Sequence, residues 1–337
     1  MGFTNFPNGL TSLGIPVFGN IPQLMVGNVF WMVAAKQTTD PYYNLIKDRV
    51  PNEMIFTNLS DAYSNITDNQ GDVLLINPGT YTSTASLTWA KDNCMIIGTG
   101  SPNQTYQPST LGSTGGVKLK CVTAAVEEIL KITGEYVSMY NIGTQNTADS
   151  AGNISDIRLV ARNFYANHCS FRGGTGATQI ATADCGVGMY IDVSVANAGN
   201  AMVMENCLFG SSGNTIRTVG AGCLVFGGGT AAGGFEPRFY NCEFSMYSST
   251  AACYFISMLA NAVFDRFCLF KNCTFMNFGS SATVLSEAIK NNNDTAWVLL
   301  QNCGGLGFAT WSSTGVKHTY ICNPAGSATG GIGISVA

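Results

Sequence analysis

The sequence predicts an all-β chain: a single-stranded right-handed parallel β-helix with a short N-terminal capping helix and an extended N-terminal arm. A composition suited to tight turns and a recurring Asn-Cys-x-Phe motif carry this prediction. Only 11% of the 337 residues are charged, and 39 are glycines. Globular proteins usually carry about a quarter charged residues, and glycine and asparagine accept the backbone angles of turns. The composition therefore favours many short strands joined by turns.

The motif recurs at intervals that fit one turn of a solenoid. Five cysteines mark its copies at steps of 30 to 38 residues: Cys169, Cys207, Cys242, Cys273 and Cys303. A second set follows at similar steps: Cys185, Cys223 and Cys253. Because the two sets advance together, we expect whole turns to repeat, each with three short strands and looped corners.

Alternation within the motif predicts which side chains face inward. Cysteine and phenylalanine stand two residues apart, so they point to the same face of a strand. We expect that face to be the core, with the preceding asparagine at a corner, bonded to the turns above and below. The predicted core ladder is Cys169, Cys207, Cys242, Cys273, Cys303, Phe171, Phe209, Phe244 and Phe275. The predicted corner ladder is Asn206, Asn241, Asn272 and Asn302.

The twelve cysteines are expected to be free, buried thiols. The chain is long, has no recognisable secretion signal, and lacks the close cysteine pairs of zinc sites. Equivalent positions in neighbouring turns lie about 4.8 Å apart, whereas disulfides prefer Cβ separations of about 3.5–4.5 Å. The alternative is that a few bridges form in an oxidising medium.

Four segments follow from these patterns: an attachment arm at 1–40, a linker and capping helix at 41–72, the β-helix at 73–322, and a tail at 323–337. No charged residue precedes Lys36. Left in water, the apolar arm would be unfavourable, so it must lie against its own body, a sister subunit or a larger assembly. Its predicted contact residues are Phe3, Phe6, Pro7, Leu10, Leu13, Ile15, Pro16, Val17 and Phe18.

The capping helix is predicted around residues 58–66. Leu59, Ala62, Tyr63 and Ile66 share one helical face, and Thr57 or Asn58 is the candidate N-cap. Gly71-Asp72, an apolar strand and Pro78-Gly79-Thr80-Tyr81 come next. This order resembles the entry to a pectate-lyase-like parallel β-helix, and the resemblance continues through Leu87-Thr88-Trp89 and residues 93–100. It implies the fold and little about activity.

The first residues carry a second resemblance. The run from Thr4 to Val17, followed by Gly27-Asn28-Val29-Phe30-Trp31, resembles the start of tailed-bacteriophage virion proteins that end in a β-helix. The resemblance implies a structural protein of the virion, assembled in the host cytoplasm. Its implied partners are its own copies in a homotrimer and the major capsid protein or other virion proteins.

Catalytic chemistry is not predicted. The candidate carboxylates are Asp156, Asp184, Asp192, Glu205, Glu236, Glu243, Asp265 and Glu287, and none forms an obvious stacked pair for glycoside hydrolysis. The two histidines, His168 and His318, lack a Gly-x-Ser-x-Gly elbow or a facing thiol. We therefore expect no enzyme, no catalytic residue, no cofactor and no metal.

The charge balance and hydropathy limit the partners further. The net charge of −4 disfavours a nucleic-acid partner, and no apolar run approaches the ~18 residues of a membrane span. The predicted function is a non-enzymatic capsid decoration (cement) or head-fibre protein that docks through its arm. The alternative is a tailspike or tail-fibre receptor-binding protein, including one that acts on a host polysaccharide.

Overall fold

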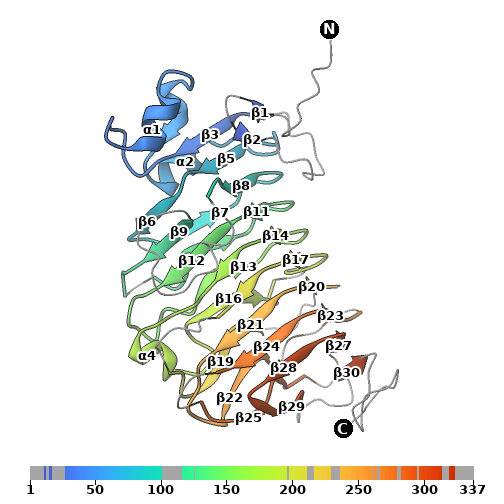
Figure 1. Ribbon diagram of the computed structural model, residues 1–337. Coiled ribbons are helices and arrows are strands. Elements are labelled where there is room, and N and C mark those ends of the chain that lie inside the picture. The colour runs from blue at the N-terminus through green and yellow to red at the C-terminus, as the bar shows by residue number, and fades with distance from the viewer. Residues whose placement is uncertain are drawn as a thin grey trace.

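The computed structural model describes residues 11–12, 15–16, 27–100, 116–124, 126–195, 197–210, 216–228, 236–260, 262, 264, 266–278, 282–293, 296–312 and 319–322. Within this part the chain winds into a stack of turns that runs from the N-terminal to the C-terminal end (Figure 1). Strands in each of the three large sheets pair in parallel with the turns before and after. The prediction of a right-handed parallel β-helix is confirmed.

Three sheets form the walls of the stack. The seven-stranded sheet contains β7 (Leu87–Trp89), β10 (Leu130–Ile132), β13 (Ser155–Leu159), β16 (Val187–Asp192), β19 (Gly220–Gly227), β22 (Cys253–Met258) and β26 (Ile289–Asn291). The eight-stranded sheet contains β6 (Gly79–Ser83), β9 (Val117–Cys121), β12 (Ile142–Asn146), β15 (Ser170–Phe171), β18 (Leu208–Phe209), β21 (Glu243–Met246), β24 (Thr274–Asn277) and β28 (Gly304–Leu306). The eleven-stranded sheet contains β3 (Val29–Met32), β4 (Ile55–Phe56), β5 (Val73–Ile76), β8 (Met95–Gly98), β11 (Ser138–Tyr140), β14 (Tyr165–Asn167), β17 (Val203–Glu205), β20 (Arg238–Tyr240), β23 (Cys268–Lys271), β27 (Val298–Gln301) and β30 (Thr319–Cys322).

Short elements complete the described chain. Two small strand pairs are β1 (Thr11–Ser12) with β2 (Ile15–Pro16), and β25 (Leu285–Glu287) with β29 (Phe308–Thr310). The helices are α1 (Pro41–Ile46), η1 (Asn52–Met54), α2 (Leu59–Asn65) and α4 (Ala177–Ile180). Helix α2 lies at the N-terminal end of the stack (Figure 1), where Asn58 accepts a hydrogen bond from the Asp61 N–H at 2.9 Å.

The stack begins earlier than the sequence indicated. Residues 29–32, which were assigned to the arm, form β3 and pair in parallel with β5. Phe30 and Met32 are buried in the core, because an apolar strand covers the otherwise open edge of the first turn. Of the predicted arm residues, only the backbone of Ile15 and Pro16 is described. The rest of the arm contacts (Phe3, Phe6, Pro7, Leu10, Leu13, Val17 and Phe18) and the tail at 323–337 lie outside the described residues.

The core is a column of stacked rings and thiols. The Phe244 ring lies 4.9 Å from that of Phe209 and 4.7 Å from that of Phe275, with interplanar angles of 8° and 9°. The five motif cysteines are all buried. All eleven cysteines whose side chains are described are free thiols. Cysteine and phenylalanine thus share the inner face, as their two-residue spacing requires.

The motif asparagines occupy a corner between the eleven-stranded and eight-stranded sheets. Asn272 Nδ2 donates to Asn241 Oδ1 at 3.2 Å, and Asn302 Nδ2 donates to Asn272 Oδ1 at 2.8 Å. The backbone of each of these asparagines is left-handed, with φ of 52–55°. Asparagine tolerates this conformation better than other residues with a Cβ.

Asn272→Ala is therefore expected to lower the free energy of unfolding by about 2 kcal/mol. It places alanine in a left-handed conformation and removes two side-chain hydrogen bonds. Asn272→Gly, the matched control, removes only the bonds and should cost about half as much. Denaturant unfolding measures both, and equal losses would contradict the contribution of the backbone angle.

The second cysteine set does not form a stacked column. Cys253 pairs with Gly220, not with Cys223, because the β19–β22 register shifts between Ala221 and Leu224. Cys185, Cys223 and Cys253 are nevertheless all buried. The shift places one more residue on β19 than on β22, so similar steps along the sequence do not give equivalent positions here.

Among the helices that the structure describes, none is long and apolar enough to cross a membrane.

Candidate functional site

Polar side chains form a row on the outer face of the seven-stranded sheet. Lys131, Arg158 and Tyr190 hold equivalent positions on β10, β13 and β16. Their strand neighbours Ile132 and Leu159 are fully buried, so the alternating side chains point away from the core. The Arg158 guanidinium carbon lies 5.9 Å from the centre of the Tyr190 ring.

Arg158 gathers three carboxyl groups. Its Nη2 lies 2.6 Å from Asp192 Oδ2, and its Nη1 lies 3.1 Å from Glu127 Oε2 and 4.0 Å from Glu128 Oε2. Nε also donates to Asp192 Oδ2, at 3.1 Å. The Asp192 and Glu128 side chains are 5% and 7% exposed, whereas that of Glu127 is 56% exposed. One guanidinium thus sits between two buried carboxyls and one that faces solvent.

The two buried carboxyls differ in their ionisation. Burial raises the pKa of Glu128 and outweighs the opposing effect of Arg158. Its Oε2 is buried and accepts no hydrogen bond within the described chain. Burial also acts to raise the pKa of Asp192, but hydrogen bonds from Ser194 and Arg158 outweigh it, and the pKa is lowered. Such a pair supplies a proton donor and an ionised base at the same pH.

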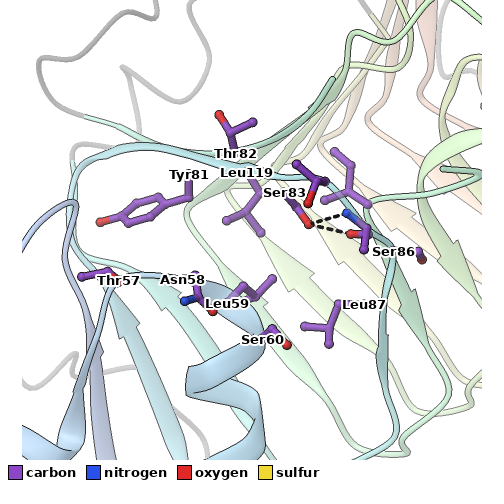
Figure 2. Close-up of a pocket in the computed structure, with 13 residues that line it drawn as sticks. Thr57, Asn58, Leu59, Ser60, Tyr81, Thr82, Ser83, Ser86, Leu87 and Leu119 are labelled. Carbon is purple, nitrogen blue, oxygen red and sulfur yellow. Dashed lines mark hydrogen bonds between the residues drawn. The ribbon is translucent and has the colours of Figure 1, made fainter. Parts of the chain in front are cut away.

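A pocket lies beside this cluster, where the N-terminal end of α2 meets the corner between β6 and β7. Its volume is about 250 Å³. Figure 2 shows Leu59, Leu87 and Leu119 among the side chains that line it, with the Tyr81 ring on one side. Hydroxyl groups surround this apolar surface and come from Thr57, Ser60, Thr82, Ser83, Thr84 and Ser86. None of the thirteen lining residues is charged.

Ser86 connects the pocket to the cluster. It lines the pocket, and its hydroxyl donates to Glu128 Oε1 at 3.3 Å. Strands β7, β10, β13 and β16 are consecutive in the sheet, so the pocket and Asp192 are separated by about 14 Å along the stack. A chain molecule lying along this face would reach both.

The carboxylates considered from the sequence are dispersed. Asp156 is fully buried on β13, Glu205 accepts a hydrogen bond from Tyr165 at 2.7 Å, and Glu236 pairs with Arg238 and Arg266. The remaining positions are Asp184, which accepts from the Ala221 N–H, Glu243 on β21, and the buried Glu287. Asp265 and His318 lie outside the described residues. Of these candidates, only Asp192 belongs to the Arg158 cluster.

His168 occupies the corner position that asparagine holds in the later turns. Its φ is 52°, and its side chain is exposed. In the described chain, no group of three or more histidine, cysteine or carboxylate side chains is placed to bind a metal ion.

Sequence reasoning missed Glu127, Glu128 and Arg158. The sequence did contain a signal for them: charged residues at outward positions of a predicted strand are unusual in a chain with so few charges. Arg158 stands between the inward-facing Ile157 and Leu159, and Glu127-Glu128 is an acidic pair directly before β10. Their proximity depends on the pairing of β10 with β13, which the irregular early turns conceal.

Comparisons with known proteins relate the chain to one fold. No protein-family model matches it, and no curated protein matches it in sequence. A pectin methylesterase mutant solved with a hexasaccharide superposes with a TM-score of 0.52 and 13% identity over 84% of this chain and 80% of that chain. Pectin methylesterase PemA from Erwinia chrysanthemi gives 0.46 and 11%, over 85% and 80%. ORF18 of Geobacillus virus E2 gives 0.42 and 12%, over 78% and 57%.

These matches correct one prediction. The expectation that the chain is not an enzyme is wrong: it relied on missing motifs, and a pectin methylesterase, which is an enzyme, shares this fold. At 13% identity this likeness establishes the fold and not a reaction. The chain is a right-handed parallel β-helix, similar in fold to pectin methylesterase.

Proposed function

We propose that the chain is a tailspike or tail-fibre protein of a tailed bacteriophage that binds and hydrolyses a host-surface polysaccharide. One observation carries the enzymatic part: Glu128 and Asp192, two buried carboxyls with oppositely shifted pKa values, flank Arg158 on an outer sheet face. The similarity of residues 4–31 to phage virion proteins supports the particle location. The pectin methylesterase of similar fold was solved with a hexasaccharide.

The geometry suits acid–base hydrolysis. Glu128, whose pKa is raised by burial, gives its proton in its protonated form to the leaving oxygen of the substrate as the bond to that oxygen breaks. Ionised Asp192 takes a proton from the attacking water, whose oxygen forms the new bond. Carboxyl pairs in glycoside hydrolases stand about 5–10 Å apart, a range compatible with two groups on one guanidinium. Arg158 fixes both carboxyls and balances their charge.

Glu128→Gln and Asp192→Asn are each expected to lower hydrolysis of the host's surface polysaccharide by about 10²–10⁴-fold. Reducing-end release or ester cleavage measures the rate, and circular dichroism checks folding. Glu127→Gln is the matched control, because Glu127 contacts the same guanidinium from solvent. It should keep most of the activity. Equal rates for all three variants and the wild type would contradict the assignment.

The rate should also depend on pH in a defined direction. It requires Glu128 protonated and Asp192 ionised, so it falls as pH rises through the raised pKa of Glu128. On the acid side it falls below the lowered pKa of Asp192. A pH–rate profile measures this, and a rate that keeps rising above neutral pH would exclude Glu128 as the acid.

Capsid decoration or a head-fibre role is the second candidate. It is favoured by the first 35 residues, which carry no charge and suit docking on an apolar capsid surface. The two functions differ in copy number per particle: hundreds for a decoration protein, and about ten to twenty for a tailspike. Quantitative mass spectrometry of purified virions distinguishes them. In either case we propose a homotrimer, which analytical ultracentrifugation tests.

A further inference from the structure

The pocket beside α2 differs from the rest of the polar face in its chemistry. Its apolar surface comes from Leu59, Leu87, Leu119 and Ile129, and hydroxyl-bearing residues surround it. A sugar ring has the matching pattern, with apolar C–H faces and hydroxyl groups around the edge. The cavity of about 250 Å³ holds roughly eight waters at ~30 Å³ each, the space of one monosaccharide unit.

The electrostatics of the pocket discriminate between sugars. None of its thirteen described lining residues is a lysine or arginine, so an acidic sugar would find no charge partner among them. Two carboxyl groups lie one hydrogen bond from the lining: Asp61 through Asn58 and Glu128 through Ser86. A uronate or sialate in the pocket would lose water without a cation to compensate it, and would lie close to two other carboxyl groups. A neutral sugar meets neither cost.

We infer that this pocket binds one neutral monosaccharide unit, so that the polysaccharide bound along this face is uncharged there. The inference rests on the proposed function, since it names the substrate class of the same face. Neighbouring units of the glycan would run from the pocket across β10 and β13 to Asp192, about 14 Å away along the stack. The pocket thus fixes which bond lies at the carboxyl cluster.

The test is binding of the full chain to an array of neutral glycans and of glycans that contain uronic or sialic acids. Wild-type protein should bind neutral glycans at least tenfold more tightly than acidic ones. Ser86→Lys places a cation and extra volume at the pocket, and should weaken binding to neutral glycans at least tenfold. Ser286→Lys adds the same charge at an exposed position on β25 and should leave binding unchanged. Thermal unfolding verifies that both variants fold.

The outcomes separate the two claims. Preferential binding to acidic glycans overturns the neutral-sugar inference and leaves the proposed function in place. Neutral-glycan binding that Ser86→Lys does not weaken excludes this pocket as the site. Absence of binding to every glycan overturns the proposed function and the inference together.

Discussion

Replacing Phe244 with alanine is expected to lower the free energy of unfolding by about 3–5 kcal/mol. The side chain is fully buried and lies between the rings of Phe209 and Phe275 in near-parallel stacks. The rings of Phe239 and Phe270 meet it edge-on at 5.9 and 5.6 Å. Alanine therefore removes contacts in three successive turns and leaves a cavity that stacked strands cannot close.

Denaturant unfolding of the full chain measures this loss. Phe278→Ala is the control, because Phe278 follows β24 in the same turn as Phe275 and is 39% exposed. It should cost less than about 1 kcal/mol. If both variants unfold at the same denaturant concentration, the ring column does not contribute as its geometry indicates. A solenoid that unfolds turn by turn should show a broader transition in Phe244→Ala than in the control.

Asp156→Asn is expected to change how stability depends on pH. Asp156 is fully buried and accepts hydrogen bonds from the Thr144 hydroxyl at 2.9 Å, the Asn146 N–H at 2.6 Å and the Gly173 N–H at 2.9 Å. Burial nevertheless raises the pKa of Asp156 from 3.8 to about 6, since these bonds only partly replace hydration. The folded protein therefore binds this proton more tightly than the unfolded chain does.

The sign of the effect follows from this difference. Because the folded pKa exceeds the unfolded one, the contribution of Asp156 to stability is greatest below about pH 4 and declines as pH rises to about 6. The shift of roughly two units corresponds to about 3 kcal/mol. Asparagine does not titrate. Between pH 4 and pH 7 the free energy of unfolding of Asp156→Asn should therefore rise by about 2.5 kcal/mol relative to that of the wild type.

Urea unfolding of both proteins at pH 4 and pH 7 measures how the difference between their free energies of unfolding changes with pH. Asp48→Asn, which removes an exposed carboxyl beside α1, is the control and should track the wild type closely. A constant gap between wild type and Asp156→Asn across this range would mean that Asp156 titrates alike in the folded and unfolded states.

The sequence was informative where one residue type repeats at one structural position. Adjacent asparagine and cysteine residues, such as Asn272 and Cys273, recur in each of the later turns. Their corner and core positions were therefore predictable from strand alternation alone. The start of the stack was not predictable, because Val29–Met32 has the same apolar character whether it pairs with β5 or lies on another surface. This segment pairs with β5 because the edge of β5 would otherwise be unpaired, and that edge exists only in the folded chain.

The carboxyl cluster was harder to predict for a related reason. Glu128 and Asp192 are 64 positions apart in sequence, and their approach depends on two strand pairings and on the guanidinium between them. Because the two carboxylates lie in different turns, the sequence of any one turn does not contain this pair. The pocket depends on even more of the tertiary structure, since Leu59, Leu87 and Leu119 come from three separate elements that meet only at one corner.

The buried thiols have a consequence for where this protein is able to fold and persist. Burial raises the pKa of Cys169 and Cys207 well above the ordinary value, so these thiols stay protonated and unreactive. None of the eleven described cysteines forms a disulfide. Strand pairing and ring stacking do not depend on the redox conditions. The described stack therefore contains no disulfide that a reducing medium could break, and its strand pairing and ring stacking hold it together there.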